Sequence, residues 1–288
     1  MSHDIMYFHV GDSDYLLTSV KQLQHFNPDS RIHLIGRGVS EEVKGLVNFY
    51  DYEELMCREA GAFLYNFKNY STNDADFEKI CILRWYLIRN LCIERNISKF
   101  FCLDSDIMVY CNLKEELSKF DHNRYSLTHC IAASSACFND VTALNDYCDF
   151  VSGFYDVSRI NEHFILRGEK QKTFGHYRAD LLNVYQNRIS NNLPGGICDM
   201  TFWGELRTFD APVMIGEMSS VLDGTTFDHN INSRDFFEYE NGMKKIVWDN
   251  GLPYCKNIFL DKLIRFNTLH FQGYETKKLM KEHKTYDE

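Results

Sequence analysis

The first fifty residues alternate between apolar runs and polar breaks in a pattern that predicts a strand, a helix and a second strand. Residues 5–10 are rich in apolar side chains and end at a glycine, which is typical of a buried strand. Apolar residues recur at helical spacing within residues 15–25, and Asp12 or Ser13 can cap that helix. After an Asn-Pro-Asp turn, residues 31–35 predict the next strand. Such a βαβ unit has parallel strands and belongs to a sheet covered by helices.

The clearest helical periodicity lies in residues 77–95, where leucine and isoleucine recur every three or four positions. Asp74 or Asp76 can cap this helix. It leads into KFFCLDSD, residues 99–106, which predicts a strand buried on both faces that ends in a loop. Ligands of open α/β sheets bind beyond the carboxyl ends of the strands, so this loop is where a functional site is expected.

The remaining elements have weaker patterns. Residues 48–52 and 125–132 each predict a strand, and a helix is expected to begin after Asn139. Residues 244–257 predict two strands around an Asp-Asn-Gly turn. Residues 151–193 are polar and aromatic and give no clear assignment. We therefore expect one continuous α/β domain with a loop-rich second half.

Composition narrows the functional classes. The chain has 288 residues, of which 44% are hydrophobic, so it can bury a large core. Its formal net charge of −10 argues against a nucleic-acid partner, because binding phosphates needs a surplus of cations. The ten cysteines are scattered and form no CxxC pair, which indicates reduced core residues and not a zinc site. With no secretion signal and no apolar run of membrane-spanning length, we predict a soluble, cytoplasmic protein.

Asp104 and Asp106 lie one residue apart, and two carboxylates this close repel each other unless a cation lies between them. Carboxylate oxygens suit Mg²⁺ or Mn²⁺, which keep open positions for substrate phosphates. The same spacing in Asp12 and Asp14 falls where a helix begins, so a helix cap is the simpler interpretation there. A calcium-binding loop is excluded because Met108 stands at one of its ligand positions.

Several segments resemble motifs of metal-dependent GT-A glycosyltransferases, and they occur in the same order. FCLDSDIMVYCNLKEEL resembles the DxD segment of that family, and FEKICILRWYLIRNL resembles the helix before it. HVGDSDYLLTSVKQLQHFNPDSRIHLIG is similar to the first nucleotide-binding βαβ unit. GGICDMTFW, residues 195–203, resembles a later Gly-x-x-Asp segment. LHFQGYETKK, residues 269–278, resembles the HFxGxxK ending of glycogenin and of the bacterial lipopolysaccharide glucosyl- and galactosyltransferases.

This resemblance implies the GT-A (nucleotide-diphospho-sugar transferase) fold, with a mostly parallel central sheet flanked by helices. It implies a single domain over residues 1–288, in which residues 1–125 form the nucleotide-binding half. Residues 126–288 would form the acceptor-binding half and the C-terminal metal and phosphate segment. The implied reaction moves a sugar from a nucleotide-diphosphate donor, a UDP-sugar, to a hydroxyl of an acceptor glycan or glycolipid. The HFQG ending resembles enzymes that retain the anomeric configuration.

The resemblance also assigns a divalent ion, Mn²⁺ or Mg²⁺, to three ligands: Asp104, Asp106 and His270. Gly273 would let the backbone approach the diphosphate closely, and Lys277 or Lys278 would pair with it. The spacing from His270 to Lys277 is one residue longer than in the family, which leaves the choice of lysine open. The donor nucleotide is assigned to a further set of residues, namely His9, Val10, Gly11, Asp14, Tyr15 and Ser105. For Tyr15, core packing is the alternative.

Four residues have both a functional and a structural interpretation. Lys79 and Arg84, on the helix before the aspartates, can present cations to the phosphates or the donor sugar, or can be surface charges. Asp199 matches a catalytic-site carboxylate that binds sugar hydroxyls or the acceptor, or it caps a helix. Trp203 is either part of the core or a platform for a sugar ring. The sequence departs from the family at residues 132–139, AASSACFN, where relatives carry NSG.

Two other functions remain open at this stage. A metal-dependent phosphoryl hydrolase would use Asp104 as its nucleophile. A non-catalytic glycan-binding protein would need no metal. The lysines near the C-terminus, which include Lys281 and Lys284, suggest peripheral contact with an anionic membrane.

Overall fold

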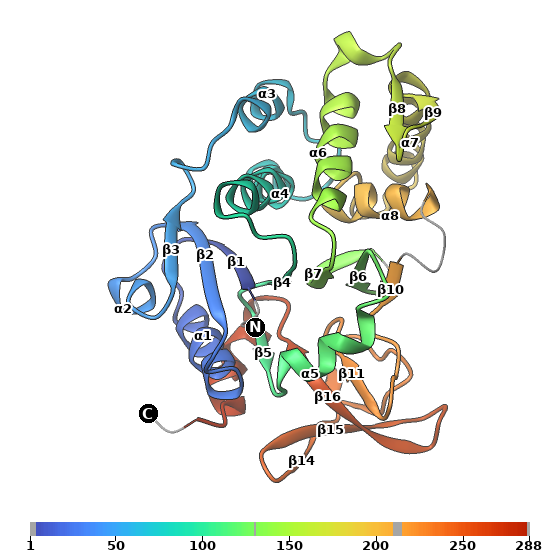
Figure 1. Ribbon diagram of the computed structural model, residues 1–288. Coiled ribbons are helices and arrows are strands. Elements are labelled where there is room, and N and C mark those ends of the chain that lie inside the picture. Colours follow the sequence, from blue (N-terminus) through green and yellow to red (C-terminus); the bar gives the residue numbers. More distant parts are fainter. Residues whose placement is uncertain (1–3, 130, 210–214, 287–288) are drawn as a thin grey trace. The chain divides into compact units, whose positions relative to one another are not determined.

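The computed structural model describes residues 4–129, 131–209 and 215–286 (Figure 1). The chain divides into two compact units. The first unit contains Met1–Asp51, Lys99–Asn139 and Val213–Glu288, and the second contains Tyr52–Ser98 and Asp140–Pro212. Each unit therefore combines segments that are distant in the sequence.

The first unit is built on a seven-stranded sheet in the order β10-β6-β7-β4-β1-β2-β3. The strands of this sheet are β1 (Asp4–Val10), β2 (Arg31–Arg37), β3 (Asn48–Asp51), β4 (Phe100–Leu103), β6 (Tyr125–Thr128), β7 (Ala132–Phe138) and β10 (Ile215–Glu217). β1, β2, β3 and β4 run parallel, and β10 is parallel to β6, whereas β7 is antiparallel to both β4 and β6. The expected α/β fold with a mostly parallel central sheet flanked by helices is confirmed.

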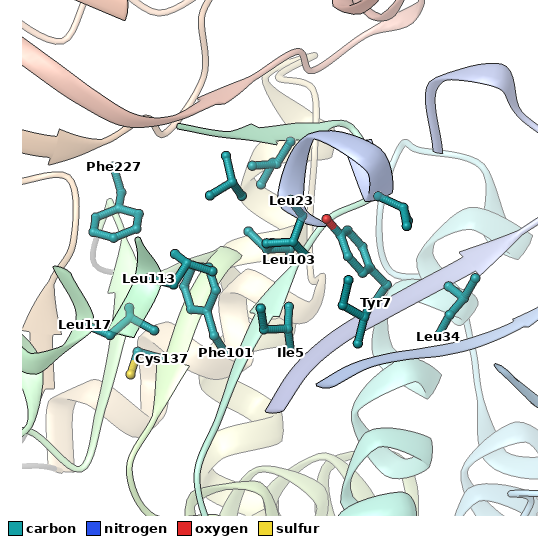
Figure 2. Close-up of a cluster of buried hydrophobic side chains, with 14 of the residues drawn as sticks. Ile5, Tyr7, Leu23, Leu34, Phe101, Leu103, Leu113, Leu117, Cys137 and Phe227 are labelled. Carbon is teal, nitrogen blue, oxygen red and sulfur yellow. The ribbon is translucent and has the colours of Figure 1, made fainter. Parts of the chain in front are cut away.

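The predicted βαβ unit is present as β1, α1 (Asp14–Phe26) and β2. Figure 2 shows how Ile5 and Tyr7 of β1, Leu34 of β2 and Leu23 of α1 enter one buried cluster. Leu103 of β4 joins this cluster and is paired with Tyr7 in the sheet. The strand that leads to the two aspartates is thus anchored in the core.

The prediction of one strand over residues 125–132 is wrong. β6 ends at Thr128 and β7 begins at Ala132, and the two strands are antiparallel. The Thr128 hydroxyl donates a hydrogen bond to the Ala132 carbonyl (2.9 Å), which closes the connection between them. Both strands are fully buried, and residues 129–131 between them include no Gly, Pro, Asn or Asp, so no turn signal in the sequence marks the reversal.

A second sheet of the first unit contains five strands: β5 (Ile107–Val109), β11 (Thr225–Phe227), β14 (Val247–Asp249), β15 (Leu252–Asn257) and β16 (Lys262–His270). β14 and β15 are the predicted hairpin, and Asn250 and Gly251 at its turn have φ of 48° and 75°. Two consecutive positive φ values are the signature of the turn that Asn-Gly favours. The short elements of this unit are α2 (Glu41–Lys44), α5 (Leu113–Leu117), η1 (Ser118–Phe120), β12 (Tyr239–Glu240), β13 (Met243–Lys244), α9 (Tyr274–Lys277) and η4 (Lys278–His283).

The second unit is mainly helical. Its elements are α3 (Arg58–Asn66), α4 (Ala75–Arg95), α6 (Thr142–Tyr155), η2 (Val157–Arg159), β8 (His163–Leu166), β9 (Glu169–Thr173), α7 (Phe174–Ser190) and α8 (Asp199–Phe209). α4 is the predicted long helix, and the Asp74 carboxylate caps it by accepting from two backbone N–H groups, at 3.0 and 2.9 Å. The segment that the sequence left unassigned contains the end of α6, the β8–β9 hairpin and α7. Within the described ranges, no helix has the length and apolar character needed to cross a bilayer.

Candidate metal and phosphate site

The two aspartates occupy a tight turn at the carboxyl end of β4. The Asp104 N–H donates to the Ser134 carbonyl of β7 at 2.7 Å, and the Ile107 N–H donates to the Asp104 carbonyl at 3.2 Å. β5 begins directly after the turn and is fully buried. Because both flanking strands are fixed, the turn holds the carboxylates of Asp104 and Asp106 on a rigid base.

His270 reaches this turn through strand pairing. β16 runs antiparallel to β5, and its register pairs His270 with Ile107, the residue after Asp106. The Phe271 N–H also donates to the Asp106 carbonyl at 2.9 Å. One oxygen from each of the two aspartates and one imidazole nitrogen of His270 then lie within 4.8 Å of one another. The structure thus brings together the three residues that the sequence nominated as metal ligands.

These three groups fit a divalent cation. An ion with bonds of about 2.0–2.5 Å holds adjacent ligand atoms about 3 Å apart and no two ligand atoms more than about 5 Å apart, and the three ligand atoms here lie within 4.8 Å of one another. The His270 Nδ1–H donates to the His229 carbonyl at 2.5 Å, so its Nε2 is the nitrogen that faces Asp106, at 3.4 Å from Oδ1. This hydrogen bond fixes the tautomer that a metal-binding histidine needs. Two carboxylate oxygens and one imidazole are ligands that Mn²⁺ accepts.

The charges at the site favour a cation between the side chains. Burial opposes protonation of His270, but the hydrogen bond to Asp106 and the negative charges of Asp106 and Asp104 outweigh it and raise the pKa of His270 to about 9. Burial would raise the pKa of Asp106, yet contact with His270 and Lys277 lowers that pKa to about 2. The shift of His270 shows that the two aspartates favour a positive charge at the imidazole, where a bound cation would replace the proton, whereas the shift of Asp106 comes from the positive charges of His270 and Lys277.

A buried ion-pair network that the sequence analysis missed holds the segment around His270. Asp228 accepts from the His270 backbone N–H at 3.0 Å and from the Lys244 ammonium at 2.9 Å. Lys244 also contacts Asp235 at 3.0 Å and the Asn230 carbonyl at 2.6 Å. The side chains of Asp228 and Lys244 are 0% and 1% exposed. In the sequence this segment is marked by an Asp-His pair directly after Thr-Thr-Phe, a strand that is buried in the fold, but the pair alone does not reveal these contacts.

The structure distinguishes the two candidate phosphate-binding lysines. The Lys277 ammonium lies 3.1 Å from Asp106 Oδ2 and 4.8 Å from the centre of the Tyr15 ring. Lys278 instead pairs with Glu275 at the surface, at 2.9 Å. Gly273 has a φ of 102°, a conformation that other residues rarely adopt, and it begins the short helix that carries Lys277. Of the two lysines, Lys277 is therefore the one that contacts the candidate metal ligands.

Two of the residues assigned to the nucleotide meet beside the aspartates. His9 Nδ1 and the Ser105 hydroxyl form a hydrogen bond of 2.9 Å, and the His9 ring packs edge-on against Tyr15. Burial and the nearby Lys277 charge lower the pKa of His9 to about 4, so the ring is neutral. Its Nε2 is buried and has no hydrogen-bond partner among the described residues, which leaves it available to a ligand.

The other residues assigned to the nucleotide are less engaged. Val10 is 42% exposed, and Gly11 adopts a φ of 103° while donating its N–H to the Arg37 carbonyl. Asp14 lies at the surface, where it pairs with Lys281 at 2.9 Å. Lys277, Lys278 and Lys281 thus all take part in ion pairs within the protein, which reduces the positive charge that the C-terminal segment presents.

Two of the candidates in the second unit, Arg84 and Asp199, form an ion pair, whereas Lys79 does not join them. Arg84 of α4 and Asp199 of α8 form an ion pair of 2.7 Å with little solvent exposure, and Asp199 also accepts from the Met200 N–H. Lys79 pairs with Asp76 at 2.6 Å near the surface, as its structural interpretation predicts. Trp203 is completely buried and stacks on Tyr147 at 4.4 Å, so it belongs to the core and offers no platform for a sugar ring.

Comparison with solved structures finds glycosyltransferases. The chain is similar to mouse xyloside xylosyltransferase 1 in its apo form, at 12% identity and a TM-score of 0.46 over 78% of this chain and 87% of that one. It is similar to the galactosyltransferase LgtC in complex with donor and acceptor sugar analogs, at 12% identity and a TM-score of 0.42 over 99% and 98% of the two chains. It is also similar to apo glycosyltransferase GlyE of Streptococcus pneumoniae TIGR4, at 13% identity and a TM-score of 0.42 over 100% of this chain and 61% of that one. No family model and no curated protein sequence matches the chain. At such identities the likeness concerns the fold alone.

Proposed function

We propose that the protein is a metal-dependent glycosyltransferase that moves a sugar from a UDP-sugar to a hydroxyl of an acceptor glycan or glycolipid. The observation that carries this proposal is the cluster of Asp104, Asp106 and His270, whose ligand atoms lie within 4.8 Å of one another. It stands at the carboxyl end of a central parallel strand, which is where α/β sheets bind nucleotides. A lysine and a neutral, partly unsatisfied histidine lie beside it.

Asp104, Asp106 and His270 would hold a divalent cation, with Mn²⁺ the ion we favour, and when bound it would supply positive charge for the departing diphosphate. Lys277 adds a second positive charge, because its ammonium already contacts Asp106 and can turn to a phosphate oxygen without leaving the site. The buried Nε2 of His9 can donate to or accept from the nucleotide, according to its tautomer, while Ser105 holds Nδ1. Tyr15 limits access of water to Lys277 by covering its ammonium with an aromatic ring.

For the sugar, we propose that Arg84 and Asp199 act as a pair. Asp199 accepts hydrogen bonds from sugar hydroxyls, and Arg84 fixes the orientation of its carboxylate. We further propose that the anomeric configuration is retained, as the HFQG ending suggests. The first sugar anomer released from a UDP-α-sugar, observed by proton NMR, should then be α; release of the β anomer first would contradict retention.

A thermal-shift screen of UDP and UDP-sugars, with Mn²⁺ or with EDTA, tests the proposal. A ligand that binds only the folded state raises the unfolding temperature, so we expect a shift that requires nucleotide and Mn²⁺ together. The shift should be absent in Asp106→Asn and preserved in the control Asp29→Asn, which changes an exposed aspartate in a turn. If no UDP compound gives a metal-dependent shift, the proposed function is wrong.

A further inference from the structure

The second unit contains a cavity of about 310 Å³ that shares no residue with the metal and phosphate site. Its lining residues belong to α3, α4 and α6, which pack against one another, and to η2 and the residue before it. All of its lining residues belong to the second unit. Its volume is at the small end of the range for pockets that bind small molecules.

The walls of this cavity combine apolar and polar groups. Phe63, Cys148 and Tyr155 are buried residues that form its apolar part. Asn66 of α3 and Ser152 of α6 add groups that form hydrogen bonds. Aromatic rings beside a few polar groups are typical of sites that bind amphipathic, hydroxyl-bearing ligands.

Arg89 is the group in the cavity whose hydrogen bonds are least satisfied. Its Nε is buried and has no hydrogen-bond partner among the described residues. Among the described residues, its NH2 group contacts the Cys57 sulfur at 3.8 Å and Glu59 at a long 3.7 Å, and the guanidinium lies 5.7 Å from the centre of the Tyr86 ring. The side chain of Arg89 is 14% exposed. A guanidinium with five donors that is withdrawn from water and so weakly engaged is a ready partner for ligand oxygens.

The charges around Arg89 determine whether the cavity favours anionic or neutral ligand oxygens. Glu59, Asp149 and Asp156 place three carboxylates on the cavity, and these repel a phosphate or carboxylate ligand. Arg159, the second arginine, already pairs with Asp149 at 2.9 Å and with Glu162 at 2.8 Å. Hydroxyl groups suit both kinds of residue, because they donate to carboxylates and accept from a guanidinium.

We propose that this cavity binds a short, neutral saccharide, with Arg89 donating to its oxygens and Glu59 and Asp149 accepting from its hydroxyls. The proposal adds a binding site and no reaction, and it does not depend on the function proposed above. Binding here requires no metal and no nucleotide. A neutral oligosaccharide is therefore retained by the protein in EDTA.

An array of neutral and acidic oligosaccharides, incubated with the labelled full-length protein in EDTA, tests the proposal. The strongest neutral ligand is then titrated calorimetrically against wild type, Arg89→Ala, Glu59→Gln and Arg58→Ala. We expect Arg89→Ala to weaken binding at least about tenfold, as the loss of charged hydrogen bonds does. Glu59→Gln should weaken it several-fold. Arg58→Ala, which removes an exposed arginine of the same helix as Glu59, should change nothing.

Glu59 is 58% exposed, so its substitution leaves the fold intact. The Glu59→Gln variant therefore tests saccharide binding even if Arg89→Ala unfolds. The proposal is overturned if no neutral oligosaccharide is retained in EDTA, or if only acidic ones are. It is also overturned if neither Arg89→Ala nor Glu59→Gln weakens binding.

Discussion

At the scale of single residues, the candidate site is an arrangement of charges in which each member is fixed by another. The His270 ring is oriented by the His229 carbonyl, Asp106 faces both His270 and Lys277, and Ser105 holds His9. Sequence motifs nominate two neighbouring lysines for the same role, and only the contacts separate them.

The two lysines provide a direct test. We expect Lys277→Ala to weaken the binding of UDP in the presence of Mn²⁺ by at least about tenfold, because it removes one charged contact to the diphosphate. Lys278→Ala, which breaks an exposed pair with Glu275 and a contact with the Tyr274 ring, should bind UDP as wild type does. Calorimetric titration of both variants with UDP and Mn²⁺ measures this difference. If both variants lost UDP affinity equally, Lys277 would not be the phosphate-binding lysine.

The sequence could nominate Asp104, Asp106 and His270 because they stand in short motifs with a recognisable order. It could not find Asp228 or Lys244, because these act through contacts between segments that only the fold brings together. It also could not separate core from site for Trp203, since an aromatic residue at the start of a helix suits both.

At the scale of elements, β16 is the strand that must be held in register, since a slip of one residue would turn His270 away from the aspartates. Two buried polar networks hold it. One is the Asp228–Lys244 pair near its end, and the other is Glu116 of α5, which contacts Arg265 at 2.7 Å and Asn267 at 2.9 Å.

Removing one partner of the Asp228–Lys244 pair should be costly. We expect Lys244→Met to lower the free energy of unfolding by about 3 kcal/mol, because it leaves a buried carboxylate without its cation. Lys245→Met is the matched control, since Lys245 is 52% exposed and its contact with Glu240 is 3.5 Å long; we expect a change within about 0.5 kcal/mol. Urea unfolding of both variants measures the difference, and similar losses would contradict a structural role for the buried pair.

Glu116 makes the stability of the first unit depend on pH. Burial would raise the pKa of Glu116, but hydrogen bonds from Lys119, Thr225 and Asn267 outweigh it and lower the pKa. A carboxyl group with a lowered pKa in the folded state stabilises the fold above its unfolded pKa, about 4.3, and this stabilisation is lost as the pH falls. We expect Glu116→Gln to cost about 2 kcal/mol at pH 7 and progressively less below about pH 4. Urea unfolding of wild type and Glu116→Gln from pH 7 to below pH 4 measures this cost. A difference in the free energy of unfolding that did not change with pH would contradict the lowered pKa of Glu116.

Elements with strong local signals were predicted well, and those that depend on tertiary pairing were not. α4 has both its periodicity and its cap in the sequence, and the β14–β15 hairpin has its turn residues. β6 and β7 lack such signals, because both are wholly buried and the connection between them carries no Gly or Pro.

At the scale of the whole molecule, the chain crosses between its two units more than once, which no local pattern in the sequence reveals. Each unit has its own core: the cluster around Ile5 and Phe101 in the first, and the stacked aromatic residues around Trp203 in the second. Stability therefore depends on apolar packing in both units.

The cysteines should contribute to stability without disulfide bonds. The nine cysteines within the described residues are reduced, and most of them are buried. We expect the unfolding temperature to be the same with and without a reductant such as dithiothreitol. A reductant that lowers it by several degrees would indicate a stabilising disulfide and contradict this description.

Binding of Mn²⁺ itself tests the central claim most directly. Electron paramagnetic resonance counts free Mn²⁺ in a titration, without any assumption about the donor sugar or the acceptor. We expect wild type to bind one Mn²⁺ per chain in the presence of UDP, and each of Asp104→Asn, Asp106→Asn and His270→Ala to weaken that binding at least about tenfold. Wild-type protein that leaves Mn²⁺ free, or variants that bind it as tightly as wild type, would contradict the account.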